Sequence, residues 1–145
     1  MMEILFRGKR LDNGEWVEGY LYITHNGEHE ISIYNDEVNI ERWTHEVDHS
    51  TVGQYTGLKD KNGNRVFDGD ILHIAKIYDG LGGYYHPALD YHVNVVVKWD
   101  LCAWMWETLC EDKRYISFPN AWCHYECEVI GNIHDNKLED FDNGR

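Results

Sequence analysis

The chain has 145 residues, and its 26 acidic and 13 basic side chains give a net charge of −13. A domain of this length buries a sizeable core without disulfides or a structural metal, and a field of this sign repels phosphate backbones and anionic lipid. We therefore expect one main domain whose partners are neither duplex nucleic acid nor membranes.

The residue composition favours β-strands. Aromatic residues make up 14% of the chain, including 6 Trp and 10 Tyr, and aromatic side chains suit a pleated, half-buried surface. There are 13 Gly and only 2 Pro, and many of the glycines follow Asn or Asp, as they do in tight hairpin turns. The composition predicts a mostly β protein built from hairpins.

The chain carries no recognisable segment for export or membrane insertion. No run approaches the roughly 18 apolar residues of a membrane span. The opening residues, MMEILFR, lack the basic and then apolar stretch of a signal peptide. We therefore expect a cytoplasmic protein in which the four cysteines are reduced, namely Cys102, Cys110, Cys123 and Cys127.

Alternating residues predict a hairpin at the start of the chain. Two strands, 4–10 and 16–23, are joined by Asp12-Asn13-Gly14, which is typical of a tight turn. The second strand has two distinct faces. One of them carries Trp16, Glu18, Tyr20 and Tyr22.

The next segments are less regular. Asn26-Gly27 predicts a second tight turn into a strand at 29–34, whereas residues 35–50 fit a strand or one helical turn equally well. A short strand is expected at 51–56. Residues 57–64 are expected to form a polar loop, with the strongest turn signal of the chain at Asn62-Gly63.

The second half predicts further strands and a closing helical turn. Three glycines and a proline predict a loop at 80–89, and residues 136–141 predict one turn of helix, too short to be stable without packing. The expected strands are 71–78, 92–99, 101–106, 115–118 and 128–133. Five strands within about 95 residues suit a small closed or half-closed barrel, which also removes exposed sheet edges.

Four motifs resemble one known family. They are ILFRGK at 4–9, VDHSTVGQYTGLKDKNG at 47–63, VFDGDI at 66–71 and EVIGNIHDN at 128–136. In this order along the chain they closely resemble the YopX-like family, whose members are encoded largely by bacteriophages and prophages.

The resemblance implies a fold and a setting, but no activity. It implies an SH3-like barrel over about residues 50–135 with an N-terminal β extension, a phage or prophage gene in a bacterial host, and self-association. We therefore expect an N-terminal β-hairpin extension at 1–50 and an SH3-like barrel domain at 51–145, the two forming one compact unit or two. No catalytic residue follows from the resemblance.

The cysteines raise the question of a zinc site. Tetrahedral zinc sites use pairs of ligands two to four residues apart. Cys123 and Cys127 have such a spacing, but Cys102 and Cys110 have seven residues between them and make a poor second pair. Because buried free cysteines behave as small apolar groups, we expect no metal here.

Two histidine pairs have a spacing that a helix would place on one face: His25 with His29, and His45 with His49. The first pair flanks the Asn26-Gly27 turn, so the helical argument fails there. We expect neither pair to bind a metal, and no nucleophile elbow, phosphate-binding loop, dinucleotide fingerprint or HExxH motif occurs in the chain. The sequence therefore predicts no catalytic residues and no cofactor.

The aromatic residues of the second half are the candidate partner-binding residues. Trp104 and Trp106 are expected on one face of a strand, a geometry for stacking or peptide binding if it is exposed; the competing interpretation is that they fill the core or an oligomer interface. The full candidate set is Tyr84, Tyr85, Trp99, Trp104, Trp106 and Trp122.

Two functions are consistent with these observations. The first is a non-enzymatic accessory protein that acts by protein–protein contact, including homo-oligomerisation. In one version its acidic face occupies the cationic site of a DNA-binding protein. The alternative is a barrel that binds single-stranded nucleic acid by stacking bases on the aromatics, although few Lys or Arg flank the tryptophans.

Overall fold

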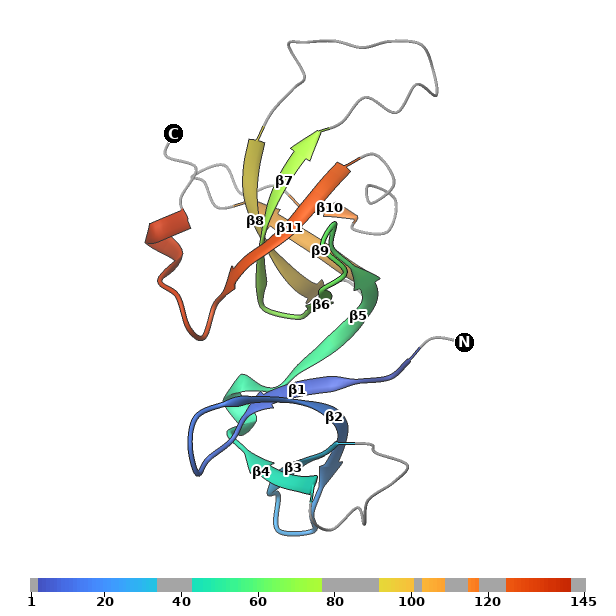
Figure 1. Ribbon diagram of the computed structural model, residues 1–145, viewed down its shortest axis with the longest axis vertical. Helices are drawn as coiled ribbons and strands as arrows, with labels where there is room; N and C mark the ends of the chain where they lie inside the picture. Colours follow the sequence, from blue (N-terminus) through green and yellow to red (C-terminus); the bar gives the residue numbers. More distant parts are fainter. Residues whose placement is uncertain are drawn as a thin grey trace. The chain divides into compact units, whose positions relative to one another are not determined.

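The computed structural model describes residues 3–33, 43–76, 92–100, 103–108, 115–117 and 125–141. They are mostly β-strand, as the composition predicts (Figure 1). The contacts divide the chain into two units, residues 1–57 and 58–145. The predicted loop at 80–89 lies outside the described residues.

The first unit is an antiparallel sheet in which each strand pairs with its neighbour in the order β4-β3-β2-β1-β5. Its elements are β1 (Phe6–Lys9), β2 (Trp16–Ile23), β3 (His29–Ser32), β4 (Thr44–Val47), the 3-10 turn η2 (His49–Thr51) and β5 (Gly53–Lys59). The predicted turns join the first three strands, with Gly14 at φ 72° and Gly27 at φ 86°. One face of this sheet buries Val17, Ile31 and Val47, against which Phe6, Leu21, Ile33 and Val52 pack.

The ambiguous segment before residue 51 contains both of the structures that its sequence allowed. Residues 44–47 are a strand and residues 49–51 are a 3-10 turn, while residues 34–42 lie outside the described part. Asp48 caps the turn, because its Oδ1 accepts from the Ser50 amide at 3.0 Å and from the Ser50 hydroxyl at 2.8 Å. The strand expected at 51–56 therefore begins at Gly53.

The second unit is a five-stranded antiparallel sheet in the order β10-β9-β8-β7-β11. Its elements are β6 (Arg65–Phe67), β7 (Asp70–Lys76), β8 (His92–Asp100), β9 (Ala103–Thr108), β10 (Tyr115–Ser117), β11 (Tyr125–Asn132) and the 3-10 turn η5 (Leu138–Phe141). The core contains Val66, Leu72, Ile74, Val95, Val97 and Cys127.

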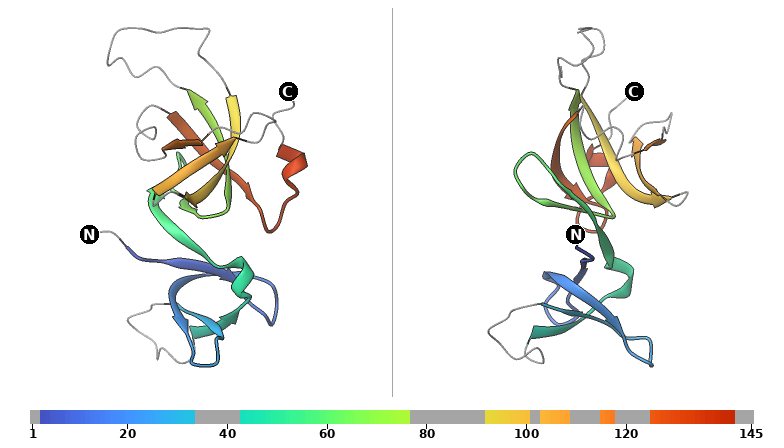
Figure 2. Two further views of the ribbon diagram at one scale, coloured as in Figure 1. Left: turned by 180° about the vertical axis from the view of Figure 1, so that it is seen from behind. Right: turned by 90° about the vertical axis from the view of Figure 1, so that its right-hand side faces the viewer.

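The closing turn of the chain forms where the sequence predicts it and packs beside β8 (Figures 1 and 2). The Asn94 side-chain amide donates to the Phe141 carbonyl at 3.0 Å. The side-chain oxygen Oδ1 of Asn94 lies 2.9 Å from His73 Nδ1 in the adjacent strand. The tertiary contact supplies the support that so short a helical turn needs.

The predicted polar loop at 57–64 is confirmed only at 60–64, where the Asn62-Gly63 turn lies, because residues 57–59 belong to β5. β5 continues through Gly57 to Lys59, the chain turns at 61–63, and β6 returns at 65–67 as the neighbour of β5. Gly57 adopts φ 88°, which a side chain would oppose. The sequence concealed this hairpin because residues 57–64 are polar and β6 is only three residues long, although β6 buries Val66 and Phe67.

Over the described residues the second sheet is open. Its edge strands are β10 and β11, and no closed barrel forms in this part of the chain. The prediction of closure rested on strand number, which does not determine whether the first and last strands pair. Here β6 hydrogen-bonds beside β5 and does not complete the five-stranded sheet.

Candidate interaction surfaces

Two tryptophans, one exposed and one half-buried, form an aromatic pair in the second unit. Trp99 on β8 lies directly opposite Trp104 on β9, so the two side chains lie on the same face of the sheet. Their ring centroids are 5.1 Å apart, with an edge-to-face angle of 73°. Trp104 is half-buried against the core, whereas Trp99 is 57% exposed.

The other four candidate aromatics are placed only in part. Trp106 lies in β9, where its backbone is opposite Val97 of β8 and Ile116 of β10. Tyr84, Tyr85 and Trp122 lie outside the described residues. The structure therefore brings together Trp99 and Trp104 from the predicted set.

The zinc interpretation gains no support from the described residues. Cys127 is buried among the apolar residues of the second core, and the other three cysteines lie outside the described part. In that part, no three His, Cys, Asp or Glu side chains are grouped so that they could hold a metal ion.

The histidines meet in a combination that sequence spacing did not suggest. The rings of His29 and His49 lie with centroids 5.7 Å apart. His29 is opposite Val47 in the β3–β4 pair, and His49 in η2 follows Val47 by two residues. The contact depends on pairing β3 with β4, and the ambiguity of residues 35–50 concealed that pairing.

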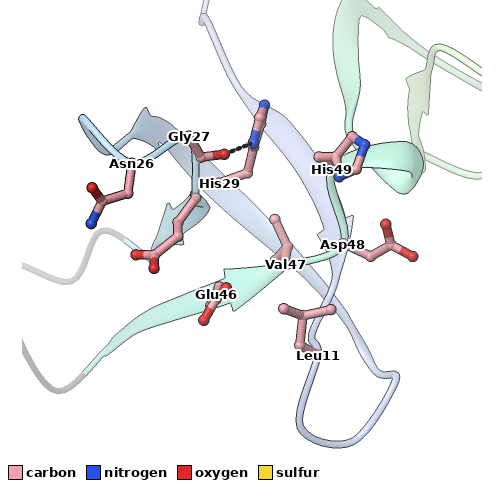
Figure 3. Close-up of a pocket in the computed structure, with 9 residues that line it drawn as sticks. Leu11, Asn26, Gly27, His29, Glu46, Val47, Asp48 and His49 are labelled. Atoms are coloured by element: carbon pink, nitrogen blue, oxygen red, sulfur yellow. Dashed lines mark hydrogen bonds between the residues drawn. The ribbon is translucent and has the colours of Figure 1, made fainter.

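These histidines border a shallow recess of about 230 Å³ lined by residues 26–29, residues 46–49 and Leu11 (Figure 3). Three carboxylates and two imidazoles line it, but several are already engaged within the chain. His29 Nδ1 donates to the Gly27 carbonyl at 3.1 Å, and Asp48 caps η2. The recess suits a small polar or cationic group.

A buried carboxylate, Asp60, is the clearest electrostatic feature of the second unit. Oδ1 accepts from the amides of Asn62 and Asn64 at 2.9 and 2.8 Å, and Oδ2 accepts from the Val129 amide of β11 at 3.0 Å. Burial raises the pKa of Asp60. Hydrogen bonds from Val129, Asn64 and Asn62 lower it by more, so the pKa lies below its ordinary value of 3.8. Since these bonds tie the β5–β6 turn to β11, the group has a structural role.

Comparison with known protein families gives a match that covers the sequence motifs of both units. A family model described as YopX protein matches residues 5–139. The chain belongs to this family. The match confirms the resemblance that the sequence motifs carry. In this YopX family member the matched residues include the Trp99–Trp104 pair, the recess and Asp60.

Two further searches, one for curated relatives and one, among the described residues, for membrane-spanning helices, found no match. No curated protein matches the sequence. Among the residues that the structure describes, no helix has the length and apolar character needed to cross a bilayer.

Proposed function

We propose that this YopX family member is a phage or prophage accessory protein that acts in the bacterial cytoplasm through non-enzymatic protein contact, in the first place by self-association. The observation that carries the proposal is the exposed Trp99 held edge-to-face on Trp104.

Physical chemistry favours such a pair as an association point. Tryptophan is enriched among the residues that dominate interface energies. The contact with Trp104 restricts the Trp99 ring before any partner arrives, which lowers the entropy cost of binding. The net charge of −13 opposes the approach of two copies, so added salt should strengthen self-association by screening that repulsion.

The test compares the wild-type chain with Trp99→Ala by sedimentation and light scattering over a range of protein concentrations and NaCl concentrations. We expect the substitution to weaken self-association about tenfold or more. Tyr22→Ala, which truncates a 61% exposed aromatic of the first unit, is the matched control and should leave the mass distribution unchanged. A wild-type chain that stays monomeric at the highest concentration, or equal effects of both substitutions, would contradict the proposal.

Single-stranded nucleic-acid binding is the second candidate, because base stacking needs an accessible aromatic ring such as Trp99. The neighbouring Lys98 forms an ion pair with the buried Glu107, so the cation nearest in sequence is already engaged. A fluorescence titration of wild type and Trp99→Phe with oligonucleotides at low salt tests whether the chain binds single-stranded nucleic acid. Emission that stays flat in both chains removes this function.

We also propose that the second unit is a partly open relative of the SH3-like barrel. The β5–β6 turn supports this relation because it closes onto β11. There the Lys61 amide donates to the Cys127 carbonyl at 2.9 Å, beside the Asp60–Val129 bond.

A further inference from the structure

The first sheet has a second face, opposite its core, that carries aromatic residues. Val17 and Leu21 of β2 belong to the core side. The residues that alternate with them, Trp16, Tyr20 and Tyr22, therefore belong to the other face. Tyr20 is 50% exposed and Tyr22 is 61% exposed. Two neighbouring tyrosines of one strand thus present their rings to solvent.

The same face is acidic beyond the tyrosines. Glu30 of β3 lies opposite Tyr22, and Glu46 of β4 lies opposite Glu30. Like charges directly opposite in an antiparallel pair are destabilising. Neither β3 nor β4 contains a lysine or an arginine, so these two strands supply no permanent cation to the pair.

The described basic residues of this unit lie in β1 or directly after it, and none of them is opposite Glu30 or Glu46. Arg10 pairs with Asp12 in the first turn. Arg7 and Lys9 of β1 lie over Trp16, with Arg7 Cζ at 4.7 Å and Lys9 Nζ at 5.5 Å from the ring centroid. On this face of the sheet, two cations of β1 therefore already lie over an aromatic ring at the start of β2.

We propose that the face formed by Tyr20, Tyr22, Glu30 and Glu46 binds an extended, arginine-containing segment of a partner protein. A guanidinium stacks on a tyrosine ring, as Arg7 lies over Trp16, and donates hydrogen bonds to the glutamates. Charge complementarity selects this occupant. A polyanion would meet the glutamates, and a second copy docking through the same face would oppose its own glutamates to them. This surface goes beyond the self-association proposed above and uses different residues.

The test measures binding of the full-length chain to a capped, fluorescently labelled peptide of four Arg-Ser repeats by anisotropy. The same peptide with citrulline, the uncharged isostere of arginine, is the ligand control. We expect the arginine peptide to bind and the citrulline peptide not to bind. Binding of the arginine peptide should weaken as the NaCl concentration rises. Because self-association should instead strengthen with salt, and Trp99→Ala should leave peptide binding unchanged, the two proposals can fail separately.

Two pairs of variants locate the site. Glu30→Gln with Glu46→Gln should weaken binding about tenfold, whereas Glu139→Gln with Asp140→Asn removes the same charge from exposed positions of the second unit and should change it less than twofold. Tyr22→Leu should weaken binding about fivefold, and Tyr22→Phe, which keeps the ring, should stay within twofold of wild type.

Folding is not expected to limit the test. Removing the Glu30–Glu46 repulsion should leave thermal stability equal to wild type or higher, so lost binding in that variant reports the surface itself. Equal losses from both charge-neutralising pairs would overturn the proposal, because binding would then follow net charge alone. Unchanged binding in Tyr22→Leu, or equal binding of the citrulline peptide, would also overturn it.

Discussion

Asp60 shows how a single side chain can join two segments far apart in the sequence. Its carboxylate satisfies two amides of its own turn and the Val129 amide of β11, which lies 69 residues further along the chain. The carboxylate is buried, with 6% of the residue exposed. Buried amide donors that lose their acceptor retain the full cost of their desolvation.

We expect Asp60→Ala to lower the free energy of unfolding by about 2–3 kcal/mol, because it leaves these amides without their charged acceptor. Urea denaturation followed by circular dichroism measures the change. Asp12→Ala removes an exposed carboxylate whose ion pair with Arg10 is surface-lying, and should leave the denaturation midpoint unchanged. A midpoint for Asp60→Ala equal to that of wild type would show that water replaces the carboxylate at no cost.

The shifted pKa of Asp60 also predicts a pH dependence. The pKa is lower in the folded chain than its ordinary value of 3.8. The ionised carboxylate therefore contributes its full stability above that value, and the contribution is lost as the pH falls through the folded pKa. The difference in unfolding free energy between wild type and Asp60→Asn should shrink on acidification in that range. A difference that stays constant below pH 3.8 would contradict this assignment.

At the scale of elements, close approach between β2 and β3 depends on Gly19. A Cβ built on Gly19 would overlap the Ser32 carbonyl oxygen and approach Ile31 Cγ2 to 3.2 Å. The obstacle is backbone, which cannot move aside as a flexible side chain can. Glycine in a strand interior often marks such a site.

Gly19→Ala should therefore destabilise the first sheet by more than about 3 kcal/mol, since it opens the β2–β3 pairing in a packed region. Hydrogen exchange of the β2 and β3 amides and a thermal melt measure the effect. The matched control is Gly27→Ala, at a turn with φ 86° and no atom within 4 Å of the added carbon; it should cost only about 1–2 kcal/mol. Similar costs for the two variants would mean that β3 shifts to accommodate the methyl group.

The elements also show where sequence reasoning succeeds. Strands bounded by Asn-Gly turns were predictable, because turn and alternation specify local geometry together. The β5–β6 hairpin was missed in spite of its Asn62-Gly63 turn, because β6 has only three residues and residues 57–59 of β5 lie in a polar segment. The Trp99–Trp104 contact was missed because the β8–β9 connection has no such turn signal. Both tryptophans were candidates from composition, but their pairing depends on the register that places Asp100 opposite Ala103.

At the scale of the whole chain, the contacts that the sequence did not predict depend on strand register between distant segments. The His29–His49 contact, the Glu30–Glu46 pair and the Asp60–Val129 bond each join residues from segments whose pairing no local pattern specifies. The acidic balance, by contrast, was readable directly: residues 1–50 carry 11 acidic and 4 basic groups, a balance of −7. The class of partner stays a prediction from charge, whereas register determines which glutamates meet.

The residues that the structure describes form two buried clusters that share no residue: Val17, Ile31 and Val47 in the first unit, and the group around Ile74 in the second. Ile31 and Ile74 are each almost fully buried. Shortening either to valine removes one methylene and costs about 1 kcal/mol. If each cluster stabilises its own unit, the loss should stay local.

We therefore expect Ile31→Val to raise amide exchange about fivefold in β1–β4 and to leave β7–β11 unchanged, while Ile74→Val should do the reverse. Native-state hydrogen exchange with mass spectrometry resolves both sets of peptides in one experiment. Faster exchange in both units from either substitution would mean that the chain unfolds as one cooperative body. In that case β5, the strand that passes from the first unit into the second, would be the element that transmits the loss.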